Sequence, residues 1–312
     1  MLALTFPGQG SQAVGMGKEL ADAYPQAKAV FDEVDEALGE YLSKVIWEGP
    51  HEDLTSTVNA QPALMAVSMA AIRALEAEGF MVTQAGFVAG HSLGEYSALA
   101  AAKALTIADT ARLLRIRGEA MQAAVPVGKG AMAAIIGLEQ SDVEAACTAA
   151  SQEDNAVQIA NDNGGGQLVI SGHKEAVERA MEACKDAGAK RALPLPVSAP
   201  FHSTLMQPAA ERMAEALETV DIKPTVVPLV CNVLADAISH PDDIKKRLIE
   251  QVTGRVRWAE SVKFMHSEGV GNIWEVGSGK VLTGLARRIE RDMTGLSIGK
   301  PEDIPAALES LS

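Results

Sequence analysis

The feature of this sequence that most constrains its fold is a serine set between two glycines, in residues 90–94 (GHSLG). Residues 86–89 (GFVA) form a short apolar run that is typical of a buried strand, and residues 95–102 (EYSALAAA) favour a helix. A tight strand-to-helix turn leaves no room for side chains two positions from the serine, which explains the glycine on each side. The sequence therefore predicts a nucleophile elbow that exposes the Ser92 hydroxyl beside the positive end of a helix.

Composition indicates a large globular protein with an acidic surface. The chain has 312 residues, of which 47% are hydrophobic and 22% charged, enough for one large domain with a smaller insert. The formal net charge of -14 argues against nucleic-acid binding, because phosphate contacts require clustered Lys and Arg. A local basic patch can still bind a negatively charged partner on such a protein.

The cysteines and the hydropathy of the sequence indicate the cellular compartment of the protein. Three cysteines are widely spaced: Cys147, Cys184 and Cys231. This spacing indicates reduced thiols rather than a disulfide or a metal site. We see no basic leader that would indicate a signal peptide, and the apolar segment 62–78 contains Arg73 and is too short to span a bilayer. We therefore expect a cytoplasmic protein without a metal or a membrane partner.

Apolar runs of strand length alternate with helix-like segments along the chain, except in residues 128–197. This alternation predicts a parallel sheet covered by helices on both faces. Because loops at the carboxyl ends of parallel strands converge, we expect residues 6–12 (FPGQGSQ), the elbow and residues 198–203 (SAPFHS) to lie together. Further expected elements are one helix over 18–38, an acidic linker over 48–54, a helix with Pro62 in its first turn, and a strand over 224–233.

Residues 128–197 follow the order strand, helix, strand, strand, helix, strand, which is the ferredoxin-like pattern. Ser141 is the expected N-cap of the first helix of this insert. The predicted fold class is therefore α/β. A parallel-sheet core would comprise residues 1–127 and 198–312, and the inserted α+β subdomain residues 128–197.

An arginine on an apolar helix stripe is the second unusual feature. In the helix expected over residues 106–124, Arg117 shares one face with Leu114 and Met121. A buried, unpaired charge costs several kcal/mol, so Arg117 requires an anion or a dense set of hydrogen-bond partners. A structural carboxylate and a bound anion both remain open as that partner.

Ser92 requires a general base, and His202 is the best candidate. Only His91 and His202 lie in conformationally restricted segments; the histidines in settings typical of the surface are His51, His173, His240 and His266. A hydrolase-like triad would place an Asp or Glu between the serine and the histidine, but no residue there is compelling, so a backbone carbonyl would have to orient the imidazole. The N–H groups of Leu93 and of the first glycine loop would form an oxyanion hole.

Together these segments resemble the malonyl-CoA:acyl-carrier-protein transacylases of bacterial type II fatty-acid synthesis. The resemblance is carried by residues 6–12, 90–95 (GHSLGE), Arg117 and 200–203 (PFHS), and extends to 161–163, 167–172 and 275–282 (EVGSGKVL). Two departures concern loops: three glycines stand at 164–166 in place of a Ser-Pro-Gly type turn, and Ser278 stands where proline is usual. Both are expected to affect loop stiffness more than chemistry.

The resemblance implies a Ser–His dyad on a hydrolase-like core. Ser92 would attack the malonyl thioester and form a malonyl-serine, with His202 as the base that later deprotonates the phosphopantetheine thiol of the carrier. The backbone N–H groups of Gln9 and Leu93 would form the oxyanion hole. The backbone carbonyl of Gln251 would orient the histidine.

The resemblance also implies the substrate contacts. Arg117 would hold the malonyl carboxylate through a bidentate pair, and the bulk of Phe201 would disfavour a methyl branch. His91, Gln61 and Asn161 would complete the substrate-binding set. The protein would be a monomeric acyltransferase with a ping-pong mechanism and no cofactor, acting on malonyl-CoA and, transiently, on acyl carrier protein.

Two other functions remain open at this point. A serine esterase or thioesterase that shares the elbow would have a triad acid and an apolar acyl pocket without Arg117. A non-catalytic carrier-binding scaffold would not need Ser92 together with His202.

An acidic carrier would require a local basic patch on this acidic protein. The candidate clusters are Lys190 with Arg191, and Arg287 and Arg288 with Arg291. Each cluster is equally consistent with ordinary solvated charges.

Overall fold

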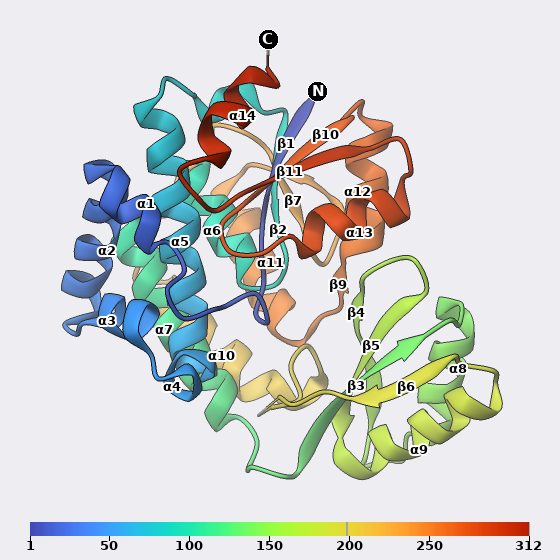
Figure 1. Cartoon of the computed structure of the whole chain (residues 1–312). Coiled ribbons are helices and arrows are strands. Elements are labelled where there is room, and N and C mark those ends of the chain that lie inside the picture. Colours follow the sequence, from blue (N-terminus) through green and yellow to red (C-terminus); the bar gives the residue numbers. More distant parts are fainter. Residues whose placement is uncertain (198, 312) are drawn as a thin grey trace.

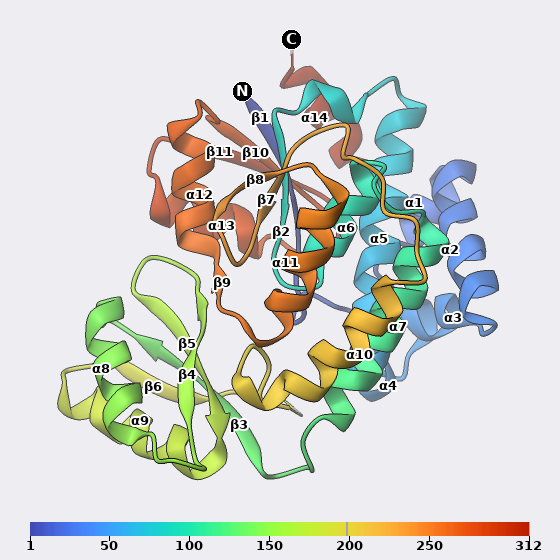
Figure 2. The ribbon, with the colours of Figure 1, turned by 180° about the vertical axis from the view of Figure 1, so that it is seen from behind.

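Two sheets organise the chain in the computed structural model, which describes residues 1–197 and 199–311. Ser198, where the core was expected to resume, and Ser312 lie outside the described residues. The larger sheet lies in the body that holds both chain ends, and the smaller sheet lies below it in the view of Figure 1. The chain enters the smaller body at the start of β3 (Gly130–Ile136), and β9 (Val256–Arg257) of the larger body lies where the two bodies meet (Figures 1 and 2).

The larger sheet has the strand order β11-β10-β1-β2-β7-β8. Its strands are β1 (Leu2–Phe6), β2 (Phe87–Gly90), β7 (Leu229–Cys231), β8 (Asp236–Ile238), β10 (Asn272–Val276) and β11 (Thr294–Ile298). Neighbouring strands run parallel except at the edge, where β7 and β8 are antiparallel. The predicted α/β fold with a parallel-sheet core is confirmed, although the strand expected over 224–233 is limited to the three residues of β7.

Helices cover both faces of this sheet, because successive side chains of a strand point to opposite faces. In β1, Leu4 packs in the core beneath α5 and α6, whereas Ala3 packs on the other face beneath α12 and α13. The helices of this body are α1 (Lys18–Ala23), α2 (Pro25–Leu38), α3 (Leu42–Glu48), α4 (His51–Thr55), α5 (Thr57–Ala77), α6 (Gly94–Ala101), α7 (Ile107–Ala123), α10 (Gln207–Leu217), α11 (Pro241–Thr253), α12 (Trp258–Ser267), α13 (Val281–Ile289) and α14 (Asp303–Glu309).

Three predicted boundaries in the N-terminal helices are wrong. The helix expected over 18–38 is divided into α1 and α2, because Tyr24 precedes proline and is extended, with φ -126° and ψ 112°. The expected acidic linker contains the short helix α4. Pro62 lies inside α5 rather than in its first turn, since that helix already begins at Thr57.

The smaller sheet has the order β6-β3-β5-β4-β9. Its strands from the insert are β3 (Gly130–Ile136), β4 (Val157–Asp162), β5 (Gln167–His173) and β6 (Arg191–Pro194), with α8 (Gln140–Ala150) and α9 (Lys174–Asp186) between them. These four strands pair with one another in antiparallel fashion, and α8 and α9 share one apolar core with β3, β4 and β5. The element order of the insert is the expected one; the domain boundaries at 127/128 and 197/198 stay a prediction.

Two details of the insert differ from expectation. The helix α8 begins at Gln140 after Glu139, so Ser141 is not its N-cap. The two-residue strand β9 (Val256–Arg257) from the larger body extends the small sheet by pairing parallel to β4. This strand joins the two bodies through backbone hydrogen bonds.

Among the described residues, no helix combines the length and the hydropathy that a membrane crossing requires.

Candidate active site

The elbow is built by a close approach of β1, β2 and α6. Ser92 has a φ of 53°, in the left-handed region that few side-chain-bearing residues adopt. A Cβ on Gly90 would lie 1.9 Å from the carbonyl carbon of Gly94, and a Cβ on Gly94 would lie 2.2 Å from the carbonyl oxygen of Phe6. The two glycines are therefore required by the packing, and the turn has the tightness that the sequence predicted.

The Ser92 hydroxyl donates a hydrogen bond of 2.7 Å to Nε2 of His202. On the other side of the ring, Nδ1 of His202 donates to the backbone carbonyl of Gln251 over 2.8 Å. This second bond assigns the ring proton to Nδ1 and leaves Nε2 free to accept the serine proton. The structure thus brings together three segments that are far apart in sequence, and no described carboxylate hydrogen-bonds to the imidazole.

His202 is held neutral by its surroundings. Its side chain is almost completely buried, and burial lowers the pKa of His202 from 6.5 to about 3. The positive charge of Arg117 contributes to this lowering of the pKa of His202, while the hydrogen bond to Gln251 opposes it. At neutral pH the imidazole is therefore an unprotonated base beside the serine.

Arg117 is a buried cation held by neutral oxygen atoms. Its side chain is 1% exposed, so the inward face that the sequence predicted is correct. Nη1 donates to Oε1 of Gln61 over 2.7 Å, and Nη2 donates to Oε1 of Gln251 over 2.8 Å and to the Ser92 hydroxyl over 3.1 Å. The structure meets the requirement with a dense set of hydrogen bonds. No described carboxylate forms an ion pair with Arg117, so of the two anionic partners left open, the structural carboxylate is not found among the described residues.

A cavity of about 420 Å³ opens above the Ser92 hydroxyl. Its walls include every predicted site residue apart from Gln251: Gln9, Gln61, His91, Ser92, Leu93, Arg117, Asn161, Phe201 and His202. Gln251 is fully buried and contacts His202 and Arg117 from behind. The combination of a nucleophile, a neutral base and a buried cation in one cavity suits covalent transfer of an acyl group that carries an anion.

The insert contributes more of the cavity wall than the predicted Asn161. Asn163, on the turn between β4 and β5, and Gln167, the first residue of β5, line the cavity, and Oδ1 of Asn163 is 2.9 Å from Nε2 of His91. The apolar lining residues that were not predicted from the sequence are Met121, Met132, Ala134, Val169, Leu195, Pro196 and Val197. The site therefore lies between the two sheets. Which strand residues of the insert face the cavity depends on how the insert is placed against the core.

Asn232 is another residue near the nucleophile that was not predicted from the sequence. Its Oδ1 accepts from the backbone N–H of Ser92 over 2.9 Å, and its Nδ2 donates to the carbonyl of Gly90 over 2.7 Å. It follows directly after β7, and polar residues at the carboxyl end of a parallel strand are the signal that could have identified it.

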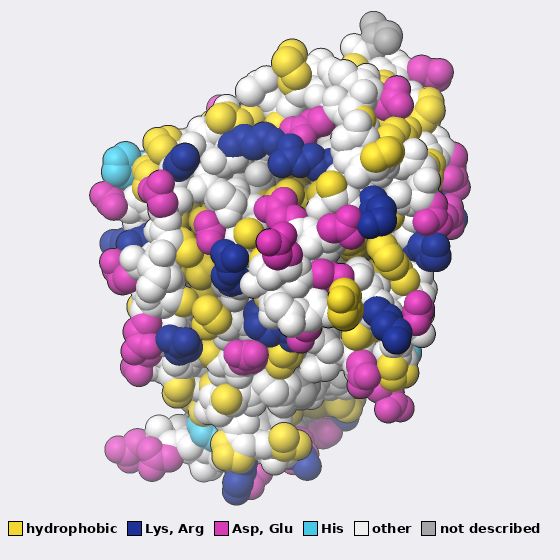
Figure 3. All heavy atoms as spheres, turned by 90° about the vertical axis from the view of Figure 1, so that its left-hand side faces the viewer, with side chains coloured by type: hydrophobic (Ala, Val, Ile, Leu, Met, Phe, Trp, Pro, Cys, Tyr) yellow, Lys and Arg dark blue, Asp and Glu magenta, His cyan; other side chains and the backbone are white. Residues whose placement is uncertain are grey.

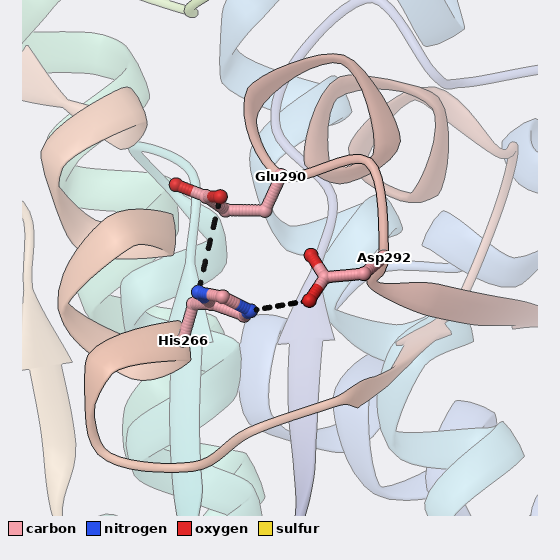
Figure 4. A group of neighbouring side chains, drawn as sticks. All are labelled: His266, Glu290 and Asp292. Atoms are coloured by element: carbon pink, nitrogen blue, oxygen red, sulfur yellow. Dashed lines mark hydrogen bonds and ion pairs between the residues drawn. The ribbon is translucent and has the colours of Figure 1, made fainter.

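One other group of side chains, among those described, has the composition of a metal site: His266, Glu290 and Asp292. Figure 4 shows the imidazole between the two carboxylates, with Nδ1 3.8 Å from Glu290 and Nε2 3.2 Å from Asp292. The carboxylates face opposite ring nitrogens rather than a common point, an arrangement that suits hydrogen bonding. The expected absence of a metal remains a prediction.

Comparison with known proteins identifies close relatives of the whole chain. The sequence profile of the family described as acyl transferase domain matches residues 4–263. The malonyl CoA-acyl carrier protein transacylase of Bacillus subtilis (strain 168) is 48% identical over 310 residues, which cover 99% of this chain and 97% of that protein.

Solved structures of related proteins have the same fold as this chain. The acyl-carrier-protein-S-malonyltransferase of Bartonella henselae is 58% identical, with a TM-score of 0.97 over 99% of each chain. A malonyl-transacylase solved in complex with a type II PKS acyl-carrier protein is 43% identical, with a TM-score of 0.96 over 99% of each chain. These similarities confirm the predicted fold class along the whole chain.

The low pKa of His202 predicts how the reactivity of Ser92 depends on pH. Only the neutral imidazole accepts the serine proton, so reactivity is lost as the pH falls through the pKa of His202, which is lowered to about 3. We expect the rate of Ser92 modification by a fluorophosphonate to stay nearly constant from about pH 8 to about pH 5. A decline centred near the ordinary histidine value of 6.5 would contradict this assignment. The His202→Gln variant, slow at every pH, is the control.

Proposed function

The chain belongs to the malonyl-CoA:acyl-carrier-protein transacylases of the acyl transferase domain family, and from this premise we propose that Ser92 carries the malonyl group between the two substrates. The protein is an acyltransferase that moves the malonyl group of malonyl-CoA to the phosphopantetheine thiol of acyl carrier protein. The observation that supports the assignment of Ser92 is its 2.7 Å hydrogen bond to the neutral imidazole of His202.

In the first half-reaction, Oγ of Ser92 attacks the carbonyl carbon of the malonyl thioester while Nε2 of His202 takes the hydroxyl proton. The backbone N–H groups of Gln9 and Leu93, on the cavity wall, stabilise the negative oxygen of the tetrahedral intermediate. The carbon–sulfur bond then breaks, and the departing CoA thiolate receives the proton from His202. A malonyl-serine and free CoA result.

In the second half-reaction, the phosphopantetheine thiol of the carrier occupies the position that CoA has left. His202 takes its proton, and the sulfur attacks the malonyl-serine carbonyl. The bond to Oγ breaks, and Ser92 recovers its proton from the imidazole. The carbonyl of Gln251 keeps the ring in one orientation for both proton transfers.

Arg117 determines that the acyl group is malonyl. Its guanidinium approaches the Ser92 hydroxyl to 3.1 Å, so an acyl group on Oγ lies beside a buried cation with which a terminal carboxylate can pair. Gln61 positions this guanidinium, while His91, Asn161 and Phe201 shape the rest of the cavity. Phe201 would restrict the space next to the carboxylate and so disfavour a methyl branch.

The esterase alternative lacks support from the site. That function was expected to show a triad acid and an apolar pocket without Arg117, whereas Arg117 lines the cavity and a backbone carbonyl orients His202. The scaffold alternative does not account for the hydrogen bond between Ser92 and His202.

Several further properties belong to this proposal. The thioester is already an activated acyl donor, so the transfer requires no cofactor or metal. We assign the protein to the cytoplasm, as a monomer whose core comprises residues 1–127 and 198–312 and whose ferredoxin-like subdomain comprises residues 128–197.

The acidic carrier requires a basic surface near the cavity. Arg287, Arg288 and Arg291 are exposed, and Nη1 of Arg288 lies 3.4 Å from Oε1 of Gln167, a residue of the cavity wall. On the face formed by the N-terminal helices, acidic and basic side chains are interspersed (Figure 3). We therefore favour the arginine cluster around Arg288 over this face and over Lys190 as the docking surface.

Trapping the intermediate tests the proposed function. We expect malonyl-CoA to leave one malonyl group on Ser92, detectable by peptide mass spectrometry, and carrier thiol to remove it much faster than water does. The Ser92→Ala variant should acquire no adduct. Release of free malonate at the same rate with and without carrier would support a hydrolase instead.

Removal of the buried cation should change acyl selectivity. We expect Arg117→Ala to lower kcat/KM for malonyl-CoA about 100-fold and to change kcat/KM for acetyl-CoA less than about threefold, because only the malonyl group loses a charge-assisted pair. Arg117→Lys keeps the charge without the bidentate geometry, so its kcat/KM for malonyl-CoA should lie between those of the wild type and of Arg117→Ala. If the preference for malonyl over acetyl survives in Arg117→Ala, the carboxylate role is wrong.

Charge reversal tests the docking surface. We expect Arg288→Glu to raise KM for the carrier about five- to tenfold at low ionic strength, with KM for malonyl-CoA unchanged. Lys190→Glu is the matched control, a reversal of the same size in the other cluster. If Lys190→Glu raises KM for the carrier more than Arg288→Glu does, the docking surface is the cluster that contains Lys190 instead.

A further inference from the structure

A buried carboxylate lies behind the elbow and takes no part in the steps above. Glu95 stands in the first turn of α6 and is completely inaccessible to solvent. Its Oε2 accepts a hydrogen bond of 2.7 Å from Nε2 of Gln251 and one of 3.2 Å from the backbone N–H of Asn232. Burial of a carboxylate is costly, so its placement at this point requires a reason.

The contacts of Gln251 allow only one orientation of its side-chain amide. Nε2 faces three acceptors, at 2.7 Å from Oε2 of Glu95, 2.9 Å from the carbonyl of Ser92 and 3.2 Å from Oδ1 of Asn232. Oε1 faces the donor Nη2 of Arg117 at 2.8 Å. A rotated amide would turn its oxygen toward the carboxylate and its N–H groups toward the guanidinium. Glu95 is the strongest of the three acceptors, since it alone can carry a full charge.

The amide of Gln251 in turn holds one end of the Arg117 guanidinium, and Gln61 holds the other. No described carboxylate pairs directly with Arg117, so its charge remains available to a ligand. In its ionised form, Glu95 interacts favourably with that charge across the side-chain amide of Gln251. Burial raises the pKa of Glu95 to about 7, against the effect of these hydrogen bonds and of Arg117.

We propose that Glu95 is a positioning residue: it fixes the amide of Gln251, and through that amide it places the guanidinium of Arg117 where the malonyl carboxylate binds. The inference rests on the proposed role of Arg117 in malonyl binding. The side chain of Asn232 holds the elbow through bonds to Ser92 and Gly90 that do not involve Glu95, so the loss of Glu95 affects the cation more than the nucleophile.

Two effects of Glu95 on malonyl binding have opposite signs, and this makes the inference testable. As a negative charge near Arg117, Glu95 weakens the attraction between the guanidinium and a malonyl carboxylate. As the anchor of Gln251, it strengthens binding by keeping the guanidinium in place. Removal of the side chain lowers KM for malonyl-CoA if the charge effect dominates and raises it if the positioning effect dominates.

The experiment compares Glu95→Met, which has no oxygen acceptor, with Glu95→Gln, which loses the charge but keeps one. We expect Glu95→Met to raise KM for malonyl-CoA about tenfold, with kcat and the KM for acetyl-CoA changed less than about threefold. Glu95→Gln should restore the malonyl KM to within about threefold of the wild-type value. An unchanged or lowered malonyl KM in Glu95→Met, or equal values in both variants, overturns the proposal.

Glu95→Asp gives the same test if Glu95→Met does not fold. It keeps the charge but withdraws the carboxylate by one methylene from Gln251, so a raised malonyl KM supports positioning and an unchanged one overturns it. Arg117→Ala separates this inference from the proposed function. If Arg117→Ala leaves malonyl binding intact, the proposed role of Arg117 is wrong. If Arg117→Ala weakens malonyl binding but the Glu95 variants do not, only the positioning role of Glu95 is wrong.

Discussion

The site depends on one buried cation, Arg117, that has no direct anionic partner among the described residues. Arg117 is held by the side-chain oxygens of Gln61 and Gln251 and by the Ser92 hydroxyl. Its charge helps to keep His202 neutral, which an acyl-transfer base requires, and remains available to a carboxylate at the nucleophile. A protein carboxylate in direct contact would have stabilised the empty site more, but it would have competed with the substrate for the same guanidinium.

Gln251 connects the parts of this arrangement. Its backbone carbonyl orients the histidine, its side-chain oxygen holds the arginine, and its amide nitrogen bonds to the serine carbonyl. The last turn of α11 thus fixes base, cation and nucleophile relative to one another. A backbone carbonyl in place of a triad acid suits this role, because it accepts the Nδ1 proton without adding a negative charge that would attract Arg117 away from a ligand.

Several elements could be predicted from sequence because their causes are local. The elbow follows from steric exclusion around Ser92, and the inward direction of Arg117 follows from helical periodicity on α7. The element order of the insert follows from strand and helix patterns. Three boundaries were predicted wrongly: the sequence pattern did not indicate the break before Pro25, the early start of α5 at Thr57, or the short length of β7. Such boundaries depend on capping and packing, which hydrophobic patterns do not contain.

The sequence by itself determined the elbow and the inward direction of Arg117, indicated Ser92 and His202 as the proposed nucleophile and base, and, through its resemblance to a family, indicated the reaction. Only the tertiary structure decided how they meet: that Ser92 and His202 lie 2.7 Å apart, that Asn232 and Glu95 hold the elbow and Gln251, and that the insert closes one wall of the cavity. The reason is physical. Steric exclusion and periodicity act over a few residues, whereas these contacts join segments more than a hundred positions apart, and their geometry is set by the packing of two sheets against each other.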